Sequence, residues 1–277
     1  MSGVGAGSGN GARRSPLRWG RALVTGASSG IGRAFAERLA AEGTDLVLVA
    51  RRGDRLEALA GALSAAHPVE VEVLPADLAA PVSRRSVELR LAASEDPVDL
   101  LVNNAGVGTH GDFAELPADR EEQQVQLNVV AVQRLCSAVL PGMLERRQGH
   151  VLNVSSIAAL YPVPHSATYG ATKAFICSFT DALHEELRGS GVVATSSLPG
   201  FVRTGFQEAA DWDGQDRLPS FVWLRAEDVA TASLDGAWSG RARVVPDLRY
   251  RTAAAVTSVV PPNARRWLLG RSSGLVR

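Results

Sequence analysis

The chain is almost without lysine and has little cysteine. Of its 29 basic residues, 28 are arginines, and the one lysine is Lys173. The two cysteines, Cys136 and Cys177, form no Cys-x-x-Cys pair, which argues against a disulfide framework and favours a reducing compartment, so we expect a cytoplasmic protein. None of the five histidines forms a ligand pair with acidic or cysteine partners, so we expect no metal site. A formal net charge of zero argues against recruitment of nucleic acid by an overall field.

Long apolar runs and a signal sequence are also missing. No apolar run approaches the roughly 20 residues that a membrane-spanning helix needs, so we expect no transmembrane segment. Residues 1–18 are rich in glycine and serine and contain no apolar stretch, which predicts a disordered leader rather than a signal peptide. With 45% hydrophobic and 21% charged residues, the chain has the composition of a soluble globular protein.

The lone lysine stands in the stretch Tyr169-Gly-Ala-Thr-Lys173. On a helix this spacing places the phenol and the ammonium on one face, about one turn apart. An ammonium at that distance favours the phenolate, so we expect it to lower the pKa of Tyr169 and to make Tyr169 a general acid or base. The alternative is a solvated pair that shares a helical turn, which the retention of one lysine among 28 arginines disfavours.

A glycine-rich turn follows the first predicted strand. Residues 21–24 are an apolar run that leads into Thr25-Gly26-Ala-Ser-Ser-Gly-Ile-Gly32, and a helical apolar periodicity begins at Ile31. Glycines at this place let the backbone pass close to a ligand, and the free N–H groups at a helix N-terminus attract an anion. The stretch therefore predicts a cradle for a pyrophosphate.

Two arginines stand at the end of the second predicted strand. Where a dinucleotide site prefers NAD, a carboxylate usually binds the ribose 2′-hydroxyl at this position. Here Ala50 is followed by Arg51 and Arg52, and guanidinium groups suit the 2′-phosphate of NADP. We therefore expect NADP(H) to be favoured over NAD(H). The alternative is a solvent-facing arginine pair at the start of the next helix.

Strand-like and helix-like segments alternate along the chain, which predicts an α/β fold. The pattern indicates one doubly wound Rossmann-type domain over residues 19–247, with a mostly parallel seven-stranded sheet and helices on both faces. We expect strands at residues 21–24, 45–50, 69–74, 98–102, 150–154, 192–198 and 242–245. Helices are expected from residue 31 and at residues 53–66, 81–94, 116–140, 166–188 and 226–238.

Polar and small residues follow several of these strands. Asp77 either holds an adenine amino group or caps the next helix. The stretch Asn103-Asn-Ala-Gly106 suits the floor of a nucleotide cleft, because α/β sheets bind ligands at the carboxyl ends of their strands. Asn128 lies inside a predicted helix, either as a tolerated polar residue or as a kink that exposes a backbone carbonyl to water.

The segment of residues 201–224 shows no regular helical or strand periodicity of apolar residues and is rich in aromatic residues, which predicts a lid over a substrate pocket. His165 either borders this pocket or is an ordinary loop histidine. The expected pocket residues are mostly apolar or aromatic: Ala158, Tyr161, His165, Phe201, Phe206 and Trp212.

In this order the motifs resemble those of the short-chain dehydrogenase/reductase family. The resemblance runs from about Arg21 to Val245, and the interval from Ser156 to Tyr169 (169 − 156 = 13) agrees with the spacing usual in the family, which selects Ser156 over Ser155. The motifs that carry it are Thr25–Gly32, Asn103–Gly106, Asn128, Ser156, Tyr169 with Lys173, and Pro199-Gly200.

The resemblance implies hydride transfer between a nicotinamide and a carbonyl or secondary alcohol. Tyr169 would give or take the proton, and Ser156 would hydrogen-bond the reacting oxygen. Lys173 would bind the ribose hydroxyls, and the backbone carbonyl of Asn128 would hold a water for proton relay. Besides Tyr169, Lys173 and the two arginines, the implied cofactor-binding residues are Gly26, Ser28, Ser29, Gly30, Ile31, Gly32, Asp77, Leu78, Asn103, Ala105, Gly106, Pro199, Gly200, Val202 and Thr204.

The chain departs from the family at its C-terminus. Many members have a glycine pair after the last strand, whereas this chain continues into a tail, residues 248–277. From Arg241 onward eight arginines accompany one acid, Asp247, which gives a net charge of +7 (8 − 1). The tail is either packed on the domain or flexible, or it contacts an anionic membrane surface. The absent glycine pair leaves a monomer, a homodimer and a homotetramer open.

These observations together predict an NADP(H)-dependent oxidoreductase that acts on a mostly apolar small molecule. The alternatives are an NAD-linked alcohol dehydrogenase of the same family and a catalytically silent dinucleotide-sensing protein. The presence of Ser156, Tyr169 and Lys173 together argues against the silent protein, because pure binding needs no acid.

Overall fold

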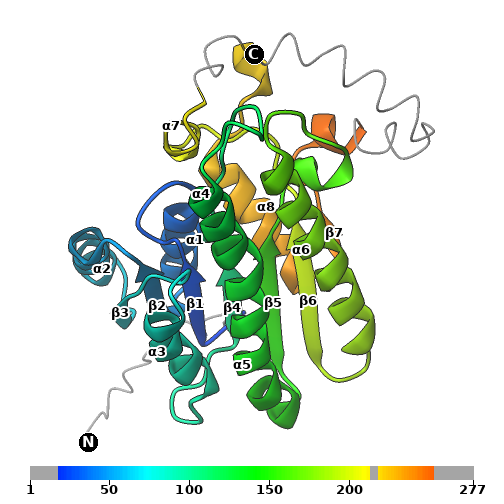
Figure 1. Ribbon diagram of the computed structural model, residues 1–277. Helices are drawn as coiled ribbons and strands as arrows, with labels where there is room; N and C mark the ends of the chain where they lie inside the picture. Colours follow the sequence, from blue (N-terminus) through cyan, green and yellow to red (C-terminus); the bar gives the residue numbers. More distant parts are fainter. Residues whose placement is uncertain (1–17, 213–217, 253–277) are drawn as a thin grey trace, which may run out of the picture.

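Parallel strands form the centre of the fold. The computed structural model describes residues 18–212 and 218–252, and within them seven strands form one sheet in the order β3-β2-β1-β4-β5-β6-β7 (Figure 1). Every pair of neighbouring strands is parallel. The strands are β1 (Arg21–Thr25), β2 (Asp45–Ala50), β3 (Val71–Pro75), β4 (Leu100–Asn103), β5 (Gly149–Val154), β6 (Val192–Ser197) and β7 (Arg243–Val244).

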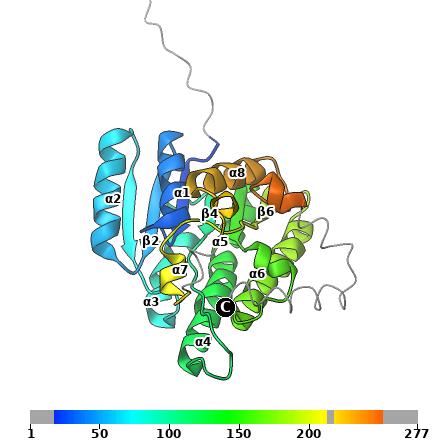
Figure 2. The same ribbon diagram turned by 90° about the horizontal axis from the view of Figure 1, so that it is seen from above.

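Helices cover both faces of this sheet. Figure 2 shows α1, α2 and α8 on one side and α3, α5 and α6 on the other. The helices are α1 (Gly30–Ala41), α2 (Gly53–Ala66), α3 (Pro81–Ala92), α4 (Ala118–Val125), α5 (Val132–Arg146), α6 (Ala167–Glu186), α7 (Phe206–Ala209) and α8 (Ala226–Trp238). A π-helix, η1 (Gln126–Ala131), joins α4 to α5, and two 3-10 turns are η2 (Ile157–Leu160) and η4 (Ser220–Val222).

The apolar runs of the strands explain the two layers of helices. In β2, Leu46 and Leu48 belong to the core packed against α1, α2 and α8, whereas Val47 and Val49 belong to the core on the opposite face. Successive side chains of a strand point to opposite faces, so a continuous apolar run is buried only when both faces are covered. The predicted Rossmann-type α/β fold is therefore confirmed, with all seven described strands parallel.

The order of the strands reverses beside β1. The chain places β2 on one side of β1 and β4 on the other, so the segments that leave β1 and β4 diverge above the sheet. In open α/β sheets a ligand binds in the crevice at such a switch point, outside the carboxyl ends of the strands. The glycine-rich turn and the Asn103–Gly106 stretch both lie there.

Most predicted boundaries agree with the structure to within two residues. The predicted bounds of β2, α2 and α8 are those observed. Strand β3 begins two residues later than predicted and ends at Pro75. Differences of this size are usual at the ends of helices and strands.

The helix predicted at residues 116–140 is wrong at its C-terminal end. Helical structure begins at Ala118 and continues past Pro141 to Arg146. A proline removes one N–H donor from a helix, but here the next turn is held by Met143, which is fully buried in the core. The π-helix η1 contains Asn128, so the helix departs from α-helical geometry at this residue.

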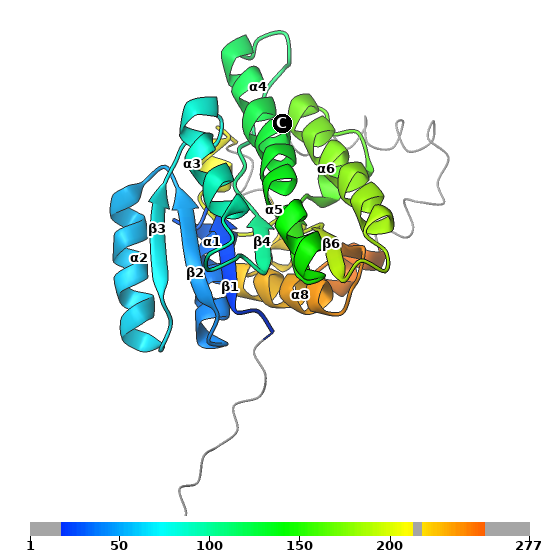
Figure 3. The same ribbon diagram turned by 90° about the horizontal axis from the view of Figure 1, so that it is seen from below.

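By length and composition alone, the helical run Ala118–Arg146 could cross a membrane. Its apolar side is occupied by the sheet, because Leu135, Cys136, Val139 and Met143 are each at most 2% exposed. Figure 3 shows α5 lying along the sheet between α3 and α6. We therefore interpret the run as a core helix of the α/β domain.

The predicted leader and tail lie almost entirely outside the described residues. Of the leader, only Arg18 is described, and its guanidinium pairs with Asp235 of α8 at 2.6 Å. Of the tail, residues 248–252 are described, and they form a short helix after β7.

An aromatic cluster closes the amino end of the sheet. The His150 ring stacks on Trp238 at 5.7 Å and meets the edge of Trp19 at 5.6 Å. Burial among these indoles lowers the pKa of His150 to about 4, and the nearby Asp99 carboxylate opposes the shift only in part. His150 is therefore neutral in the folded protein at neutral pH.

This burial predicts an acid-sensitive contribution to stability. Because the folded pKa lies below the usual 6.5, the contribution is complete above about pH 6.5 and is lost as the pH falls toward about 4. The loss amounts to at most about 3 kcal/mol. In urea unfolding at pH 8, 6 and 4.5, His150→Gln should lose less stability between pH 8 and 4.5 than the unmodified protein does. Equal losses in the two proteins would contradict the prediction.

Candidate active site

The glycine-rich turn leaves an open cradle at the start of α1. A Cβ at Gly32 would lie 2.2 Å from the carbonyl oxygen of Gly26, so only glycine fits there. Gly26 and Gly30 have φ values of +68° and +56°, a region that glycine adopts readily. Ser29 precedes α1 without a side-chain hydrogen bond that caps it, and the first turn contains no acidic residue. The N–H groups of that turn therefore face an approaching anion without competition.

Two side chains that sequence reasoning missed hold this turn in place. The Thr25 hydroxyl accepts hydrogen bonds from the main-chain N–H groups of Asn104 and Ala105, at 2.9 and 3.0 Å. The Asn104 amide in turn donates to the Thr25 carbonyl at 2.9 Å. These bonds join the end of β1 to the end of β4 across the switch point. The second amide of the Asn103-Asn104 pair is the sequence signal that could have indicated them.

Arg52 reaches the cradle directly. Its guanidinium donates to the hydroxyls of Ser28 and Ser29, at 2.9 and 3.1 Å. Within the described residues, Arg51 is exposed and has no ion pair or side-chain hydrogen bond. The two predicted arginines thus differ in position, because Arg52 contacts the glycine-rich turn whereas the Arg51 side chain is exposed to solvent.

Asp77 and Leu78 lie beyond the end of β3. The Asp77 carboxylate accepts a hydrogen bond from the N–H of Ala79 at 3.0 Å, and the residue that precedes α3 is Ala80. The predicted alternative that Asp77 caps α3 is therefore wrong, since its side chain closes a local turn instead. Leu78 is buried, and its carbonyl accepts a hydrogen bond from Arg84.

Asn103 requires a correction. Its side chain is 2% exposed and donates to the side-chain amide oxygen of Asn153 at 2.9 Å, while the Asn153 amide nitrogen donates to the Thr180 hydroxyl at 2.9 Å. The Cys136 thiol belongs to the same buried group. The Asn103 side chain is therefore committed to the interior beneath the site, and only its main chain remains for a dinucleotide.

The predicted catalytic side chains converge at the end of β5 and the start of α6. The Lys173 ammonium lies 5.7 Å from the centre of the Tyr169 ring and donates to the Val154 carbonyl at 2.9 Å. Ser156 immediately follows β5, and its hydroxyl is a hydrogen-bonding neighbour of the Tyr169 phenol. Ser155 differs, because its hydroxyl donates to the Lys173 carbonyl at 2.8 Å and so fastens α6 to β5. The geometry agrees with the choice of Ser156.

The expected lowering of the Tyr169 pKa is wrong. Burial raises the pKa of Tyr169 to about 12, and the hydrogen bond with Ser156 opposes the rise only in part. Burial also lowers the pKa of Lys173 to about 8. The physical reason is that both groups lie in an apolar environment that penalises their charged forms. Tyr169 therefore holds its proton at neutral pH, which is the state that a proton donor needs.

The Asn128 side chain joins the two halves of the site. Its oxygen accepts from the N–H of Val107 at 3.0 Å, and its amide donates to the Val107 carbonyl at 2.9 Å and to the Thr172 hydroxyl at 3.1 Å. These bonds connect the loop after β4 with α6, next to Lys173. A Cβ at Gly106 would lie 3.2 Å from the Asn128 oxygen, so this loop needs a small residue. The proposed water relay at the Asn128 carbonyl stays a prediction.

The segment after β6 closes over the glycine-rich turn. A Cβ at Gly30 would lie 3.0 Å from the Thr204 methyl group, so Thr204 lies against the turn. Val202 is buried and forms a parallel bridge with Leu224. The carbonyl of Pro199 accepts a hydrogen bond from the N–H of Ile157 at 3.0 Å. Thr204 therefore lies beside the glycine-rich turn, and the contact of Pro199, Val202 and Thr204 with the nicotinamide stays a prediction.

Several side chains predicted for the substrate pocket lie beside one another. The Phe206 ring lies 5.5 Å from the Tyr169 ring, and Phe201 stacks on Trp212 at 5.6 Å. Tyr169 is close enough to Tyr161 to contribute to the raised pKa of Tyr161. The His165 imidazole pairs with the Asp112 carboxylate at 2.7 Å, so it is a tethered loop residue at the edge of the pocket. Ala158 lies in η2, and its N–H donates to the Ser156 hydroxyl.

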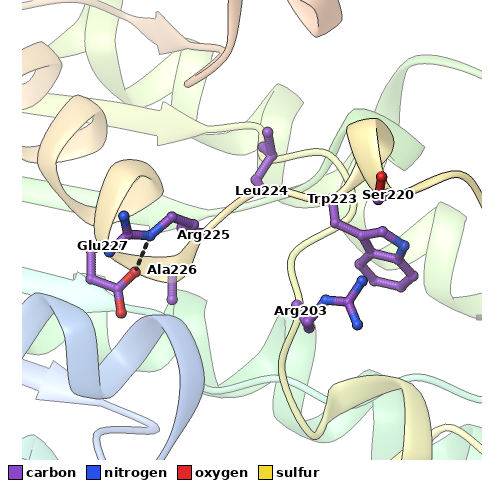
Figure 4. Close-up of a pocket in the computed structure, with 7 residues that line it drawn as sticks. All are labelled: Arg203, Ser220, Trp223, Leu224, Arg225, Ala226 and Glu227. Carbon is purple, nitrogen blue, oxygen red and sulfur yellow. Dashed lines mark hydrogen bonds and ion pairs between the residues drawn. The ribbon is translucent and has the colours of Figure 1, made fainter.

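A cavity of about 370 Å³ lies where the 201–224 segment meets the start of α8 (Figure 4). The Arg203 guanidinium lies 5.2 Å from the centre of the Trp223 ring, and Arg225 pairs with Glu227 at 3.3 Å. Neither Tyr169 nor any other predicted catalytic residue lines this cavity, so it is not the centre of the chemistry. Its lining residues are Arg203, Ser220, Trp223, Leu224, Arg225, Ala226 and Glu227.

The donor set suits a dinucleotide rather than a metal ion. Within residues 18–212 and 218–252, no three histidine, cysteine or acidic side chains gather where they could hold a metal. An uncapped helix N-terminus, glycines that leave room for backbone contact and a guanidinium at the turn are the features that bind a dinucleotide. The residues present therefore fit a nicotinamide dinucleotide.

Comparison with protein families matches residues 21–214 to the family described as short chain dehydrogenase. The match covers well over half of the chain, and the chain belongs to this family. The similar proteins of this family are named as reductases and dehydrogenases.

Four similar proteins illustrate the range. The very-long-chain 3-oxoacyl-CoA reductase of Anas platyrhynchos is 35% identical over 208 residues, which are 73% of this chain and 65% of that protein. The chain spans 59% of the corresponding reductase of Bos taurus. A short-chain dehydrogenase from Sphingobium yanoikuyae in complex with NADPH is 35% identical, with a TM-score of 0.80 over 90% of this chain and 95% of that one. The bulky-bulky ketone specific alcohol dehydrogenase from Comamonas testosteroni is 31% identical, with a TM-score of 0.74 over 87% and 94%.

The site predicts the effect of removing the phenol hydroxyl. Tyr169→Phe should lower kcat for carbonyl reduction by about 10²- to 10⁴-fold, the usual contribution of a positioned general acid. The Kd for NADPH should stay within about twofold, since the ring and Lys173 remain. Steady-state kinetics and cofactor fluorescence titration measure the two quantities. A variant with unchanged kcat would contradict the assignment.

Proposed function

We propose that this protein is an NADP(H)-dependent oxidoreductase that transfers a hydride between the nicotinamide and a carbonyl or secondary alcohol of a mostly apolar small molecule. The observation that carries the proposal is the convergence of Ser156, Tyr169 and Lys173 beside an aromatic wall, with Phe206 in contact with the catalytic ring. The segment of residues 201–224, which supplies that wall, is the proposed lid over the substrate.

Each side chain has one task in the proposed reaction. The bound nicotinamide supplies or accepts the hydride. Tyr169, which is protonated at neutral pH, donates a hydrogen bond and then its proton to the carbonyl oxygen. Ser156 donates a second hydrogen bond to the same oxygen and so stabilises the negative charge that develops there. Lys173 holds a positive charge beneath the phenol below about pH 8, which stabilises the phenolate left after proton transfer.

NADP(H) is favoured over NAD(H) by the residues at the end of β2. Ala50 supplies no carboxylate for a ribose 2′-hydroxyl, and the Arg52 guanidinium lies at 2.9 and 3.1 Å from two serine hydroxyls of the cradle. The similar protein from Sphingobium yanoikuyae was determined with NADPH, which supports the same choice. An NAD-linked enzyme is the competing proposal, and it requires Arg52 to be dispensable.

The aromatic wall favours a bulky apolar substrate. Phe201, Phe206 and Trp212 offer large apolar surfaces and few hydrogen-bonding groups, so they suit a hydrocarbon portion larger than a methyl group. The ketone specificity in the name of the Comamonas testosteroni enzyme agrees with this reading. A second candidate is the thioester of a long-chain 3-oxo acid, which is favoured by the name of the Anas platyrhynchos relative.

The cofactor proposal predicts a difference between the two neighbouring arginines. Arg52→Ala should raise the Kd for NADPH about 10- to 100-fold, because a charge-assisted contact is worth about 1.5–3 kcal/mol. The Kd for NADH should change by less than about threefold. Arg51→Ala is the matched control, and its effect on NADPH should be smaller. Equal weakening of NADPH and NADH by Arg52→Ala would contradict the assignment of Arg52 to the 2′-phosphate, and an unchanged Kd for NADPH would favour the NAD-linked alternative.

The substrate proposal is tested by cofactor oxidation over a carbonyl panel. With NADPH, bulky aryl or cyclic ketones should show a KM at least about tenfold below that of acetone, since an added apolar contact area of about 60 Å² is worth about 1.5 kcal/mol. Long-chain 3-oxoacyl thioesters are the second arm and distinguish the second candidate. NADPH-dependent quenching of tryptophan fluorescence without turnover of any panel member would favour the silent dinucleotide-sensing protein.

A further inference from the structure

Tyr250 packs on the turn that leads into the 201–224 segment. It lies in the short helix of residues 248–252, which Figure 1 shows in orange beside the upper end of α6. A Cβ at Gly200 would lie 2.2 Å from the Tyr250 ring, so the ring rests directly on the backbone of the Pro199-Gly200 turn. Only a glycine at position 200 permits this contact.

The Tyr250 hydroxyl joins the two ends of the same segment. It accepts a hydrogen bond from the N–H of Phe201 at 3.3 Å and donates one to the carbonyl of Val222 at 2.7 Å. The neighbouring Arg249 donates to the carbonyl of Phe221 and is itself held by Asp247 at 2.8 Å. The residues that follow β7 thus contact both the start and the end of the segment.

The segment has a second, independent closure at its base. The main-chain N–H of Leu224 donates to the carbonyl of Phe201 at 2.8 Å, and the main-chain N–H of Arg203 donates to the carbonyl of Leu224 at 3.2 Å. This pairing forms the bridge between Val202 and Leu224. Loss of the Tyr250 hydroxyl would therefore leave the base of the segment closed and would remove only the hydrogen bonds to Phe201 and Val222.

The residues that Tyr250 holds continue into the aromatic wall. Phe201 lies 5.6 Å from the Trp212 ring and 5.9 Å from the Trp223 ring. Burial raises the pKa of Tyr161 to about 12, and the nearby Tyr250 and Tyr169 both add to the rise. Tyr161 is therefore close to both other tyrosines of the chain.

We propose that Tyr250 is a positioning residue of the active site, which aligns the described residues 201–212 and 218–224 beside the substrate through its bonds to Phe201 and Val222 without touching the substrate itself. The proposal rests on the proposed function, in which this segment covers an apolar carbonyl compound. It also assigns a role to the start of the C-terminal tail, where the chain departs from the family pattern.

Tyr250→Phe tests the proposal, because it keeps the ring on Gly200 and removes only the hydroxyl. The KM for a bulky ketone should rise about 5- to 10-fold, the effect of one lost hydrogen bond, while kcat and the Kd for NADPH stay within about twofold. Arg251→Gln is the matched control, since Arg251 lies in the same short helix with an exposed side chain, and its KM should be unchanged. An unchanged KM in Tyr250→Phe would overturn the proposal.

Hydrogen exchange separates alignment of the segment from a general loss of stability. In Tyr250→Phe, amides of residues 201–212 and 218–224 should exchange about 5- to 10-fold faster, while those of β4 and β5 keep their protection. Uniformly faster exchange in both regions, or no change in either, would overturn the proposal. This measurement needs no substrate, so it tests the role of Tyr250 even if no carbonyl compound is turned over. The carbonyl panel tests the proposed function separately.

Discussion

Burial of the Lys173 ammonium beside the Tyr169 phenol is the constraint on which the rest of the site depends. A buried charge is costly unless it is hydrogen-bonded, and the Val154 carbonyl at 2.9 Å provides that bond. The burial that lowers the pKa of Lys173 also raises that of Tyr169, so the free protein keeps the phenol protonated. Its surroundings follow from this pair: Gly106 leaves room for the ammonium, and Asn128 ties the loop beside it to α6.

Much of this arrangement was predictable from the sequence, because it follows from local patterns. Continuous apolar runs such as Asp45–Ala50 predict strands buried on both faces, and a glycine-rich turn between a strand and a helix predicts an anion cradle. The interruption at Asn128 was also indicated by a polar residue inside an apolar helix, and the structure has a π-helix there. These features depend on neighbours in the chain, so the residues themselves report them.

The remaining features depend on contacts between distant segments. No local pattern distinguishes Arg52 from Arg51, since only the folded turn places the Ser28 and Ser29 hydroxyls beside one of them. The direction of the Tyr169 pKa shift was mispredicted because spacing on a helix reports the nearby ammonium but not the burial of both groups. The bonds between Tyr250 and the segment that begins at Phe201 span 49 residues of sequence, and no periodicity could indicate them.

A crystal structure of the ternary complex with NADP(H) and a slowly reacting bulky ketone tests the central claim most directly. The account predicts that the ketone oxygen lies within about 2.6–3.2 Å of both the Tyr169 and Ser156 hydroxyl oxygens, with the carbonyl carbon facing the nicotinamide C4 atom. A ketone oxygen bound away from both hydroxyls, with the Tyr169 phenol directed out of the pocket, would contradict it.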